Sequence, residues 1–206
     1  MGLIHDLKLL RWQWRDRYGR FHILNSIWRL TPGDLGFHWR ARYIPRYFAA
    51  AGEDIRIHEG VRFRGVHKIT CGDRVEIGVD NFLQASGGLT LGNRVMLGPG
   101  VMIWTVNHRF TDPDVPIAEQ GYDYDPVVIE DDVWIGAGSF IMPGVHLPRG
   151  CIVSARSVVA KKRYPPWSIL AGYPARVIGK RKSESEPAAV DGAESPSPGG
   201  EESRNG

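Results

Sequence analysis

The sequence predicts an all-β fold in which short parallel strands wind into a three-sided coil, and two observations lead to it. The first is that an aliphatic residue recurs every six residues through most of the second half of the chain. Twelve of the fourteen positions are isoleucine, leucine or valine, types that make up roughly a quarter of an ordinary chain. This inward register comprises Ile57, Phe63, Cys71, Ile77, Leu83, Leu91, Leu97, Ile103, Ile129, Ile135, Ile141, Leu147, Val153 and Val159.

The second observation is that the breaks in this register group the hexads in threes. Steps of eight residues occur at 63–71 and 83–91, and a step of twenty-six occurs at 103–129. Three six-residue segments make one turn of a triangular parallel β-helix, so every insertion is expected at the same corner of the prism. A sandwich of ordinary strands would instead show a period of two without a six-residue register.

Within each hexad, a short strand is followed by a bend, and each has its own inward side chain. The aliphatic side chain points inward and stacks on its equivalents in the neighbouring coils. Four residues later, a second inward position lies at a tight corner that small and β-branched side chains fit. These corner positions include Val61, Val75, Val95, Val101, Val133, Ser139, Val145, Cys151 and Ser157. Both cysteines, Cys71 and Cys151, therefore read as small core residues and not as a disulfide or a metal pair.

The remaining segments complete the domain organisation. Apolar residues at helical spacing near the start predict a short amphipathic helix, which would cover the open end of the coil; they are Leu3, Leu7, Leu10 and Trp14. The tail is poor in large apolar residues and is predicted to be disordered. The regions are a helical or extended N-terminal cap at 1–54, the β-helix at 55–163 with a loop at 109–128, a closing segment at 164–182 and the tail at 183–206.

Charge and hydropathy restrict the class of partner. The formal net charge is +3, but it is +8 without the acidic residues 183–206. This balance favours an anionic ligand but does not choose between nucleic acid, phosphate and an acidic glycan. The resemblance described below leads us to expect a small-molecule or glycan acceptor and no nucleic acid. The basic, aromatic N-terminal region is suited to peripheral contact with anionic lipid. No segment has the pattern of a membrane span or of a secretory signal, so we expect a cytoplasmic protein.

The longest insertion, residues 109–128, starts immediately after His108. Long loops inside compact domains are usually functional. An imidazole accepts a proton near neutral pH, which makes His108 a candidate general base. A solvated loop histidine is the alternative that its position alone leaves open.

Several segments together resemble the hexapeptide-repeat acyltransferases, closest to the maltose, galactoside and colanic-acid O-acetyltransferases. They are the hexads of 57–163, the Thr-x-x-His of Thr105–His108, Val133–Ala137, Ser154–Lys161 and the closing Ala171–Ile178. The resemblance covers roughly residues 36–180 and implies a left-handed parallel β-helix. It also implies acetyl-coenzyme A as acyl donor and a homotrimer with three sites, each between two neighbouring subunits.

The resemblance further implies a role for each site residue. His108 would take the proton from an acceptor hydroxyl as that oxygen attacks the thioester directly, and a backbone N–H near Ala137 would face the developing oxyanion. Lys162 and Tyr173 depart from the family pattern, which leaves the exact coenzyme contacts open. Coenzyme contacts are expected from Gly136, Ala137, Ser154, Ala155, Ala160, Lys161 and Arg176, and a wall of the acceptor pocket from Trp134. Independently of the resemblance, Asn81 and Gln84 are expected to contact the acceptor, because they lie one coil before His108.

Other activities on the same repeats remain alternatives to sugar or glycan O-acetylation. A non-catalytic trimeric glycan-binding scaffold is one, and an N-acetyltransferase or xenobiotic acetyltransferase is another. A zinc enzyme like the γ-class carbonic anhydrases would need three histidines at a spacing that His58, His67 and His146 do not supply, so no metal site is predicted.

Overall fold

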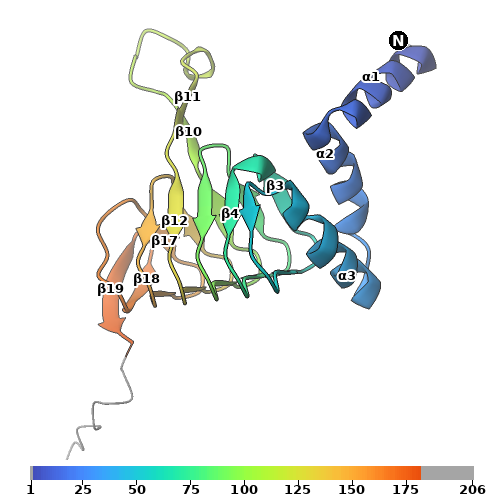
Figure 1. The fold of residues 1–206 in the computed structure, drawn as a ribbon. Helices are drawn as coiled ribbons and strands as arrows, with labels where there is room; N and C mark the ends of the chain where they lie inside the picture. Colours follow the sequence, from blue (N-terminus) through green and yellow to red (C-terminus); the bar gives the residue numbers. More distant parts are fainter. Residues whose placement is uncertain (1, 182–206) are drawn as a thin grey trace, which may run out of the picture.

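The computed structural model describes residues 2–181, and it confirms a parallel β-helix, which is preceded by three α-helices (Figure 1). The helices are α1 (Leu3–Arg15), α2 (Arg17–Trp28) and α3 (Gly33–Tyr43). Three short 3₁₀ turns occur at η1 (Pro45–Tyr47), η2 (Val66–Lys68) and η3 (Ile117–Glu119). The predicted tail at 183–206 lies outside the described residues.

Three sheets form the walls of the prism, and we name them A, B and C. Sheet A contains β1 (Ala50–Ala51), β4 (Ile69–Cys71), β7 (Leu89–Leu91), β12 (Val127–Ile129) and β15 (His146–Leu147). Sheet B contains β2 (Arg56–Ile57), β5 (Glu76–Ile77), β8 (Met96–Leu97), β13 (Trp134–Ile135), β16 (Ile152–Val153), β18 (Ser168–Gly172) and β19 (Ala175–Lys180). Sheet C contains β3 (Arg62–Arg64), β6 (Phe82–Gln84), β9 (Met102–Trp104), β14 (Phe140–Ile141) and β17 (Val158–Val159).

The predicted register is confirmed by both pairing and burial. In sheet B, Ile57 pairs with Ile77, and Ile77 pairs with Leu97, so equivalent hexads stack coil on coil. All fourteen residues of the inward register and all nine of the corner residues are buried. Burial raises the pKa of the Cys71 thiol to about 12 and also raises that of Cys151, as expected for unreactive core thiols.

The insertions leave the coil at one corner, as predicted. Each of the three interruptions connects a strand of sheet C to the next strand of sheet A: β3 to β4, β6 to β7, and β9 to β12. The third carries the antiparallel hairpin of β10 (Val106–His108) and β11 (Tyr122–Tyr124), which stands away from the body of the molecule (Figure 1).

A ladder of side-chain oxygens holds the corner between sheets A and B. The carboxylate of Asp73 accepts from the N–H of Glu53 at 2.8 Å, and the amide oxygen of Asn93 accepts from the N–H of Asp73 at 2.9 Å. The carboxylate of Asp131 then accepts from the N–H of Asn93 at 2.7 Å, and this bond lowers the pKa of Asp131. Each coil therefore supplies the acceptor that fixes the turn of the coil before it.

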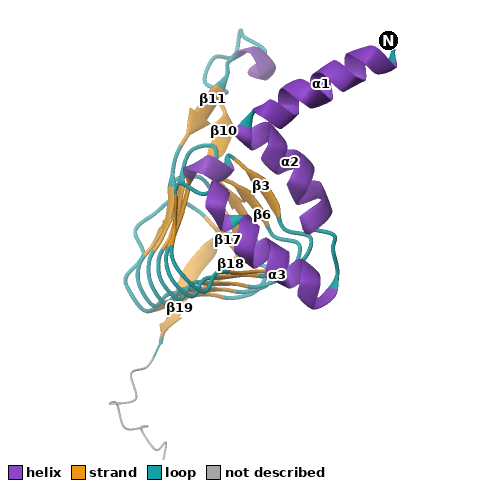
Figure 2. Ribbon diagram, turned by 45° about the vertical axis from the view of Figure 1, so that its right-hand side comes forward, coloured by secondary structure: helices purple, strands orange, loops and turns teal. Residues whose placement is uncertain are grey.

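The predicted N-terminal helix is present, but it does not cover the end of the coil. Every described side chain of α1 from His5 to Arg15 is exposed except that of Gln13. The covering role falls to α2 and α3, which lie against the first coil (Figure 2). Phe21 of α2 is fully buried and packs its ring 6.2 Å from that of Phe63. The sequence pattern identified a helix but assigned its apolar face to the wrong neighbour.

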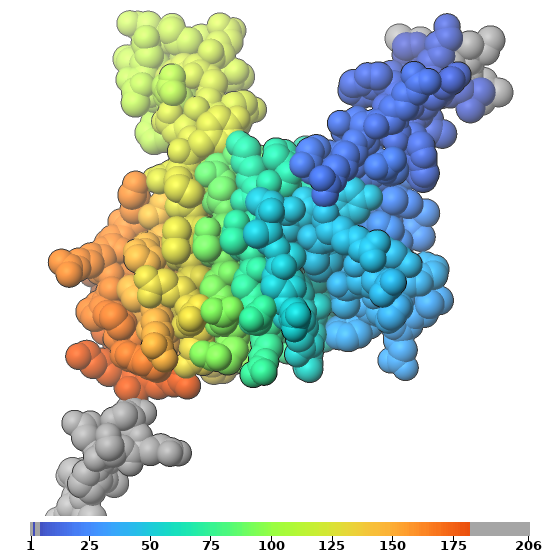
Figure 3. All heavy atoms as spheres, in the orientation of Figure 1, coloured from blue at the N-terminus to red at the C-terminus, as the bar shows by residue number. Residues whose placement is uncertain are grey.

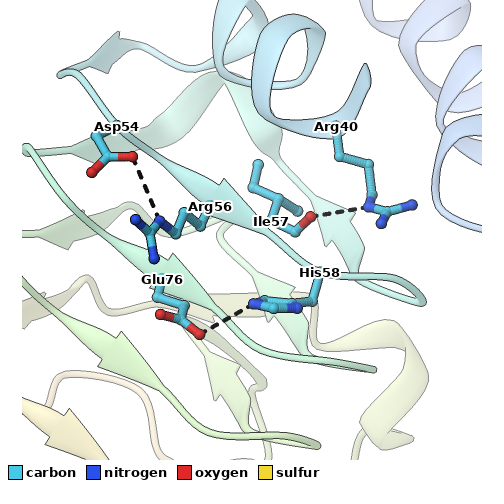
Figure 4. A network of polar contacts seen from close by, with 6 residues as sticks. All are labelled: Arg40, Asp54, Arg56, Ile57, His58 and Glu76. Carbon is cyan, nitrogen blue, oxygen red and sulfur yellow. Dashed lines mark hydrogen bonds and ion pairs between the residues drawn. The ribbon is translucent and has the colours of Figure 1, made fainter. Parts of the chain in front are cut away.

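Arg40 of α3 connects this cap to the first coil (Figure 4). It is buried, and its guanidinium donates to three carbonyl oxygens: that of Ile57 at 3.0 Å, Trp28 at 2.9 Å and Thr31 at 2.8 Å. Burial lowers the pKa of Arg40. Nearby, the exposed Asp54–Arg56 and half-buried His58–Glu76 pairs lie on the outer face of sheet B.

Replacing Arg40 by Met should destabilise the protein by about 3 kcal/mol, because three carbonyl oxygens lose a charged donor in a buried place. The measurement is the free energy of unfolding by urea denaturation. Arg42→Met is the matched control, since Arg42 lies on the same helix and is exposed. Equal stability of the two variants would contradict the role assigned to Arg40.

Among residues 2–181, no helix has both the length and the apolar character that crossing a bilayer requires.

Candidate active site

His108 is the last residue of β10, on the hairpin that leaves the corner between sheets C and A. In this hairpin His108 pairs with Tyr122, and the two rings lie 4.5 Å apart. The imidazole is exposed, and no described residue hydrogen-bonds its ring nitrogens. The base candidate is therefore fixed by a strand and remains open to a reactant from outside the chain.

The root of the hairpin is anchored by buried and charged contacts. Thr105 is fully buried, and its hydroxyl donates to the carbonyl of Gln84 at 2.8 Å while accepting from the N–H of Gly87 at 2.7 Å. The N–H of Asp125, the residue directly after β11, donates to the carbonyl of Thr105 at 3.0 Å. Lys161 then pairs with the carboxylate of Asp125 at 2.6 Å. The Thr-x-x-His spacing therefore places a rigid anchor three residues before the exposed histidine.

Asn81, predicted as an acceptor contact, lies inside the coil with no exposed surface. Its amide oxygen accepts from the N–H of Val101, and its amide nitrogen is buried without a hydrogen-bond partner among the described residues. The predicted contact with a sugar hydroxyl is therefore wrong. The six-residue register already indicated that Asn81 is buried, because Asn81 comes four residues after Ile77 and so occupies the second inward position of its hexad.

Gln84, the second predicted acceptor contact, is half-buried on the outer side of sheet C. Its side-chain oxygen accepts from the hydroxyl of Ser86 at 2.7 Å and from the N–H of Ser86 at 3.2 Å. These bonds fix the turn next to the hairpin root. The position is close to the same corner as His108.

Trp134, the third predicted acceptor contact, lies away from His108, on the outer face of sheet B. Its side chain is half exposed and lines an open pocket of about 340 Å³ together with Met96 and Ile152. Asp132 and Arg181, paired at 2.8 Å, form the polar side of this pocket. One chain therefore does not bring Trp134 and His108 together.

The predicted coenzyme contacts also separate into groups. Gly136, Ala137, Ser154 and Ala155 line the corner between sheets B and C in two successive coils. A methyl group on Gly136 would collide with the backbone nitrogen of Ala155, so only glycine lets these coils stack. Ala137 and Ala155 are exposed, and in the described part of the chain neither N–H has a hydrogen-bond acceptor. The corner offers free donors beside small side chains.

The other predicted coenzyme residues follow the last strands. Ala160 and Lys161 lie beyond β17 on the side of the hairpin root, and the carbonyl of Ala160 accepts from the hydroxyl of Tyr164 at 2.8 Å. Arg176 is exposed on β19, where it pairs with Ala171 of β18. A further basic group is Lys162, which donates to the carbonyl of Ala175 at 2.9 Å. The basic end of the prism suits a polyanion such as coenzyme A.

Sequence reasoning did not assign roles to Tyr122 or Asp125, which the hairpin places beside His108 and at its root. Aromatic and acidic residues alternate at Tyr122, Asp123, Tyr124 and Asp125, and this period of two, typical of a strand, could have indicated β11. Arg109 and Asp123 form an ion pair at 2.9 Å at the start of the loop. In the described ranges no cluster of three histidine, cysteine or carboxylate side chains could hold a metal ion.

A parallel β-helix of hexapeptide repeats with a histidine on a corner hairpin defines the class of hexapeptide-repeat transferases. Residues 126–161 match the family model described as bacterial transferase hexapeptide (six repeats). A probable acetyltransferase of Mycobacterium tuberculosis is 34% identical over 68% of this chain, which spans only 44% of that relative. A putative colanic acid biosynthesis acetyltransferase of Escherichia coli is 29% identical over 76% of this chain and 82% of its own length.

Solved structures give the same result. A maltose O-acetyltransferase from Clostridium difficile superposes with a TM-score of 0.72 at 26% identity, over 85% of this chain and 89% of its own. A hexapeptide-repeat acetyltransferase from Vibrio cholerae, solved in complex with acetyl-coenzyme A, has a TM-score of 0.70 at 26% identity, over 89% and 93%. The chain thus has the sequence repeat and the fold of the hexapeptide-repeat acyltransferases.

Proposed function

We propose that this protein transfers an acetyl group from acetyl-coenzyme A to a hydroxyl of a sugar or glycan, with His108 as general base. The observation that carries the proposal is the exposed imidazole at the end of β10, three residues after the buried anchor Thr105. The maltose, colanic-acid and acetyl-coenzyme A relatives support this substrate class and donor.

The chemistry assigned to the chain is a direct transfer. Acetyl-coenzyme A, when bound, supplies a thioester carbonyl. His108 accepts the proton of the acceptor hydroxyl as its oxygen bonds to the carbonyl carbon, and the imidazolium returns that proton to the leaving sulfur as the carbon–sulfur bond breaks. The free N–H of Ala137 is suited to donate to the developing oxyanion. No covalent intermediate on the enzyme is needed.

The separation of the site residues within one chain supports a homotrimer with sites between subunits. His108 projects from the corner between sheets C and A, whereas Trp134 and Ala155 lie on sheet B and at its corner with sheet C. The outer face of sheet C carries an aromatic row in which the ring of Trp104 lies 4.9 Å from that of Phe82 and 5.9 Å from that of Phe140. Packing this row against a second copy would bring the hairpin to the neighbour's sheet B corner.

The proposed coenzyme path follows from this arrangement. The pantetheine arm would lie along the small residues Gly136, Ala137, Ser154 and Ala155 of the neighbouring subunit. Its phosphates would meet Arg176 and Lys161 at the basic end, with Lys161 shared between the coenzyme and Asp125. Trp134 would form one wall of the acceptor pocket, and Gln84 the hydrogen-bonding side near the hairpin root.

The acceptor we favour is a glycan precursor at the cytoplasmic face of the membrane. The colanic-acid relative and the basic, aromatic N-terminal helices both support it. Two functions compete with this one: a non-catalytic glycan-binding scaffold, and acetyl transfer to an amine or an antibiotic. Measuring turnover on a panel of acceptors distinguishes among the three.

Replacing His108 by Asn should lower acetyl transfer by about two to four orders of magnitude, the usual contribution of a general base. Binding of acetyl-coenzyme A, measured by calorimetry, should be retained. The assay is thiol release with acetyl-coenzyme A across sugars, lipid-linked glycans, amino-alcohols and antibiotics. His146→Asn is the matched control, because His146 is an exposed histidine on sheet A, paired with Glu130 at 2.6 Å. Unchanged turnover in His108→Asn would contradict the assigned base.

Two inactive variants should complement each other if each site is shared between subunits. Ala155→Glu places a carboxylate on the proposed coenzyme corner of one subunit, while His108→Asn removes the base from another. Unfolding and reassembling the two together should restore part of the thiol release that neither variant shows alone. Light scattering should give the mass of a trimer for each variant and for the reassembled mixture. Absence of recovery in correctly assembled mixtures would place the whole site within one subunit.

A further inference from the structure

Helix α1 stands away from the prism, joined to it through α2 (Figures 1 and 3). From His5 to Arg15 its side chains are exposed except that of Gln13, and they include large apolar groups: Trp12 is 71% exposed, Leu7 56% and Leu10 50%. Such groups are normally buried in a soluble domain unless a binding surface requires them. The helix contributes little to the core, so its apolar residues need another explanation.

Three of the five described large apolar side chains of α1 lie on one face. Leu7, Leu10 and Trp14 follow one another at three- and four-residue spacing and so share a side of the helix. With Ile23 of α2 they line an open groove of about 710 Å³ at the elbow between the two helices. Leu9, 49% exposed, and Trp12 lie on the other side of the helix. The groove is a continuous apolar surface and not a scatter of single residues.

Cationic side chains border this groove. Arg11 and Arg15 line the groove itself, and Arg17, Arg20 and Arg46 line a separate pocket with aromatic walls. Residues 2–48 contain nine basic and three acidic residues, a formal charge of +6. Among residues 2–181, no carboxylate lies within ion-pair distance of Arg11, Arg15 or Arg20. The charge is therefore available to an external anion.

We propose that the elbow of α1 and α2 is a docking surface for an anionic lipid bilayer. A helix of thirteen residues is about 20 Å long, too short for a hydrocarbon core of about 30 Å, so it would lie along the interface. Leucine and tryptophan on one face enter the headgroup boundary, while the bordering arginines meet lipid phosphates. The inference does not depend on the identity of the acceptor or on catalysis.

A second copy of the chain fits this surface less well than lipid does. Two copies of a region with a charge of +6 repel one another, and cores of protein interfaces are depleted of charged residues. Here arginines adjoin the apolar groove directly. Tryptophan and arginine beside leucine are the composition of an interfacial helix.

The test is sedimentation of the full chain with vesicles of equimolar phosphatidylcholine and phosphatidylglycerol, compared with vesicles of phosphatidylcholine alone. Binding to the anionic vesicles should exceed binding to the neutral ones and should weaken as salt rises. Arg11→Gln with Arg15→Gln should reduce partitioning roughly thirtyfold, since each basic residue near the surface contributes about 1 kcal/mol. Leu7→Gln with Leu10→Gln should reduce it at least as much.

Leu9→Gln is the matched control, because it removes the same side chain from the opposite face of the same helix. Circular dichroism and thermal unfolding of each variant show whether the helices and the β-helix remain folded. No binding of the wild type to anionic vesicles at low salt, or equal binding to both vesicle types, would overturn the proposal. So would a loss of binding in Leu9→Gln equal to that in Leu7→Gln with Leu10→Gln. A lower oligomer mass of the groove variants without vesicles would assign the groove to a second copy instead.

Discussion

The inward side chains of the hexads stack directly on one another along three rows, and this apolar contact keeps each coil in register with the next. Ile57, Ile77 and Leu97 form one such row, and each is buried. Full burial of a residue of this size stabilises a protein by roughly 1.5–3 kcal/mol. A single coil cannot bury its own aliphatic residue, because the contacts come from the coils above and below. The rows therefore make the repeats interdependent and the prism rigid.

That rigidity decides where the chain can depart from regular structure. An insertion within a wall would separate stacked residues, whereas an insertion at a corner leaves the rows intact. The corner between sheets C and A carries three insertions, and the longest holds His108. Buried Thr105 fixes the root of that hairpin through hydrogen bonds to the neighbouring coil. The side chain of His108 can therefore extend into solvent without losing its position, as the catalysis proposed for it requires.

The two ends of the prism are completed by different means. At the C-terminal end, β18 adds a parallel strand to sheet B and β19 folds back on it. At the N-terminal end α2 and α3 cover the first coil, and Arg40 satisfies three carbonyl oxygens between them. Because this cap is complete without α1, the apolar face of α1 is free for a separate task. The lipid surface proposed for it would bring the enzyme close to membrane-borne glycans.

The sequence by itself determined the coil, the common corner of its insertions and the place of His108 at the start of the longest one. These follow from a six-residue period, which depends on contacts between equivalent positions and so repeats along the chain. It also indicated that Asn81 is buried, through its place four residues after Ile77, although that signal was not used. Only the tertiary structure decided that α1 leaves the body and that Trp134 and His108 lie on different edges. Helical periodicity shows that a face is apolar but not what covers it, and the separation of two edges depends on how the coils close in space.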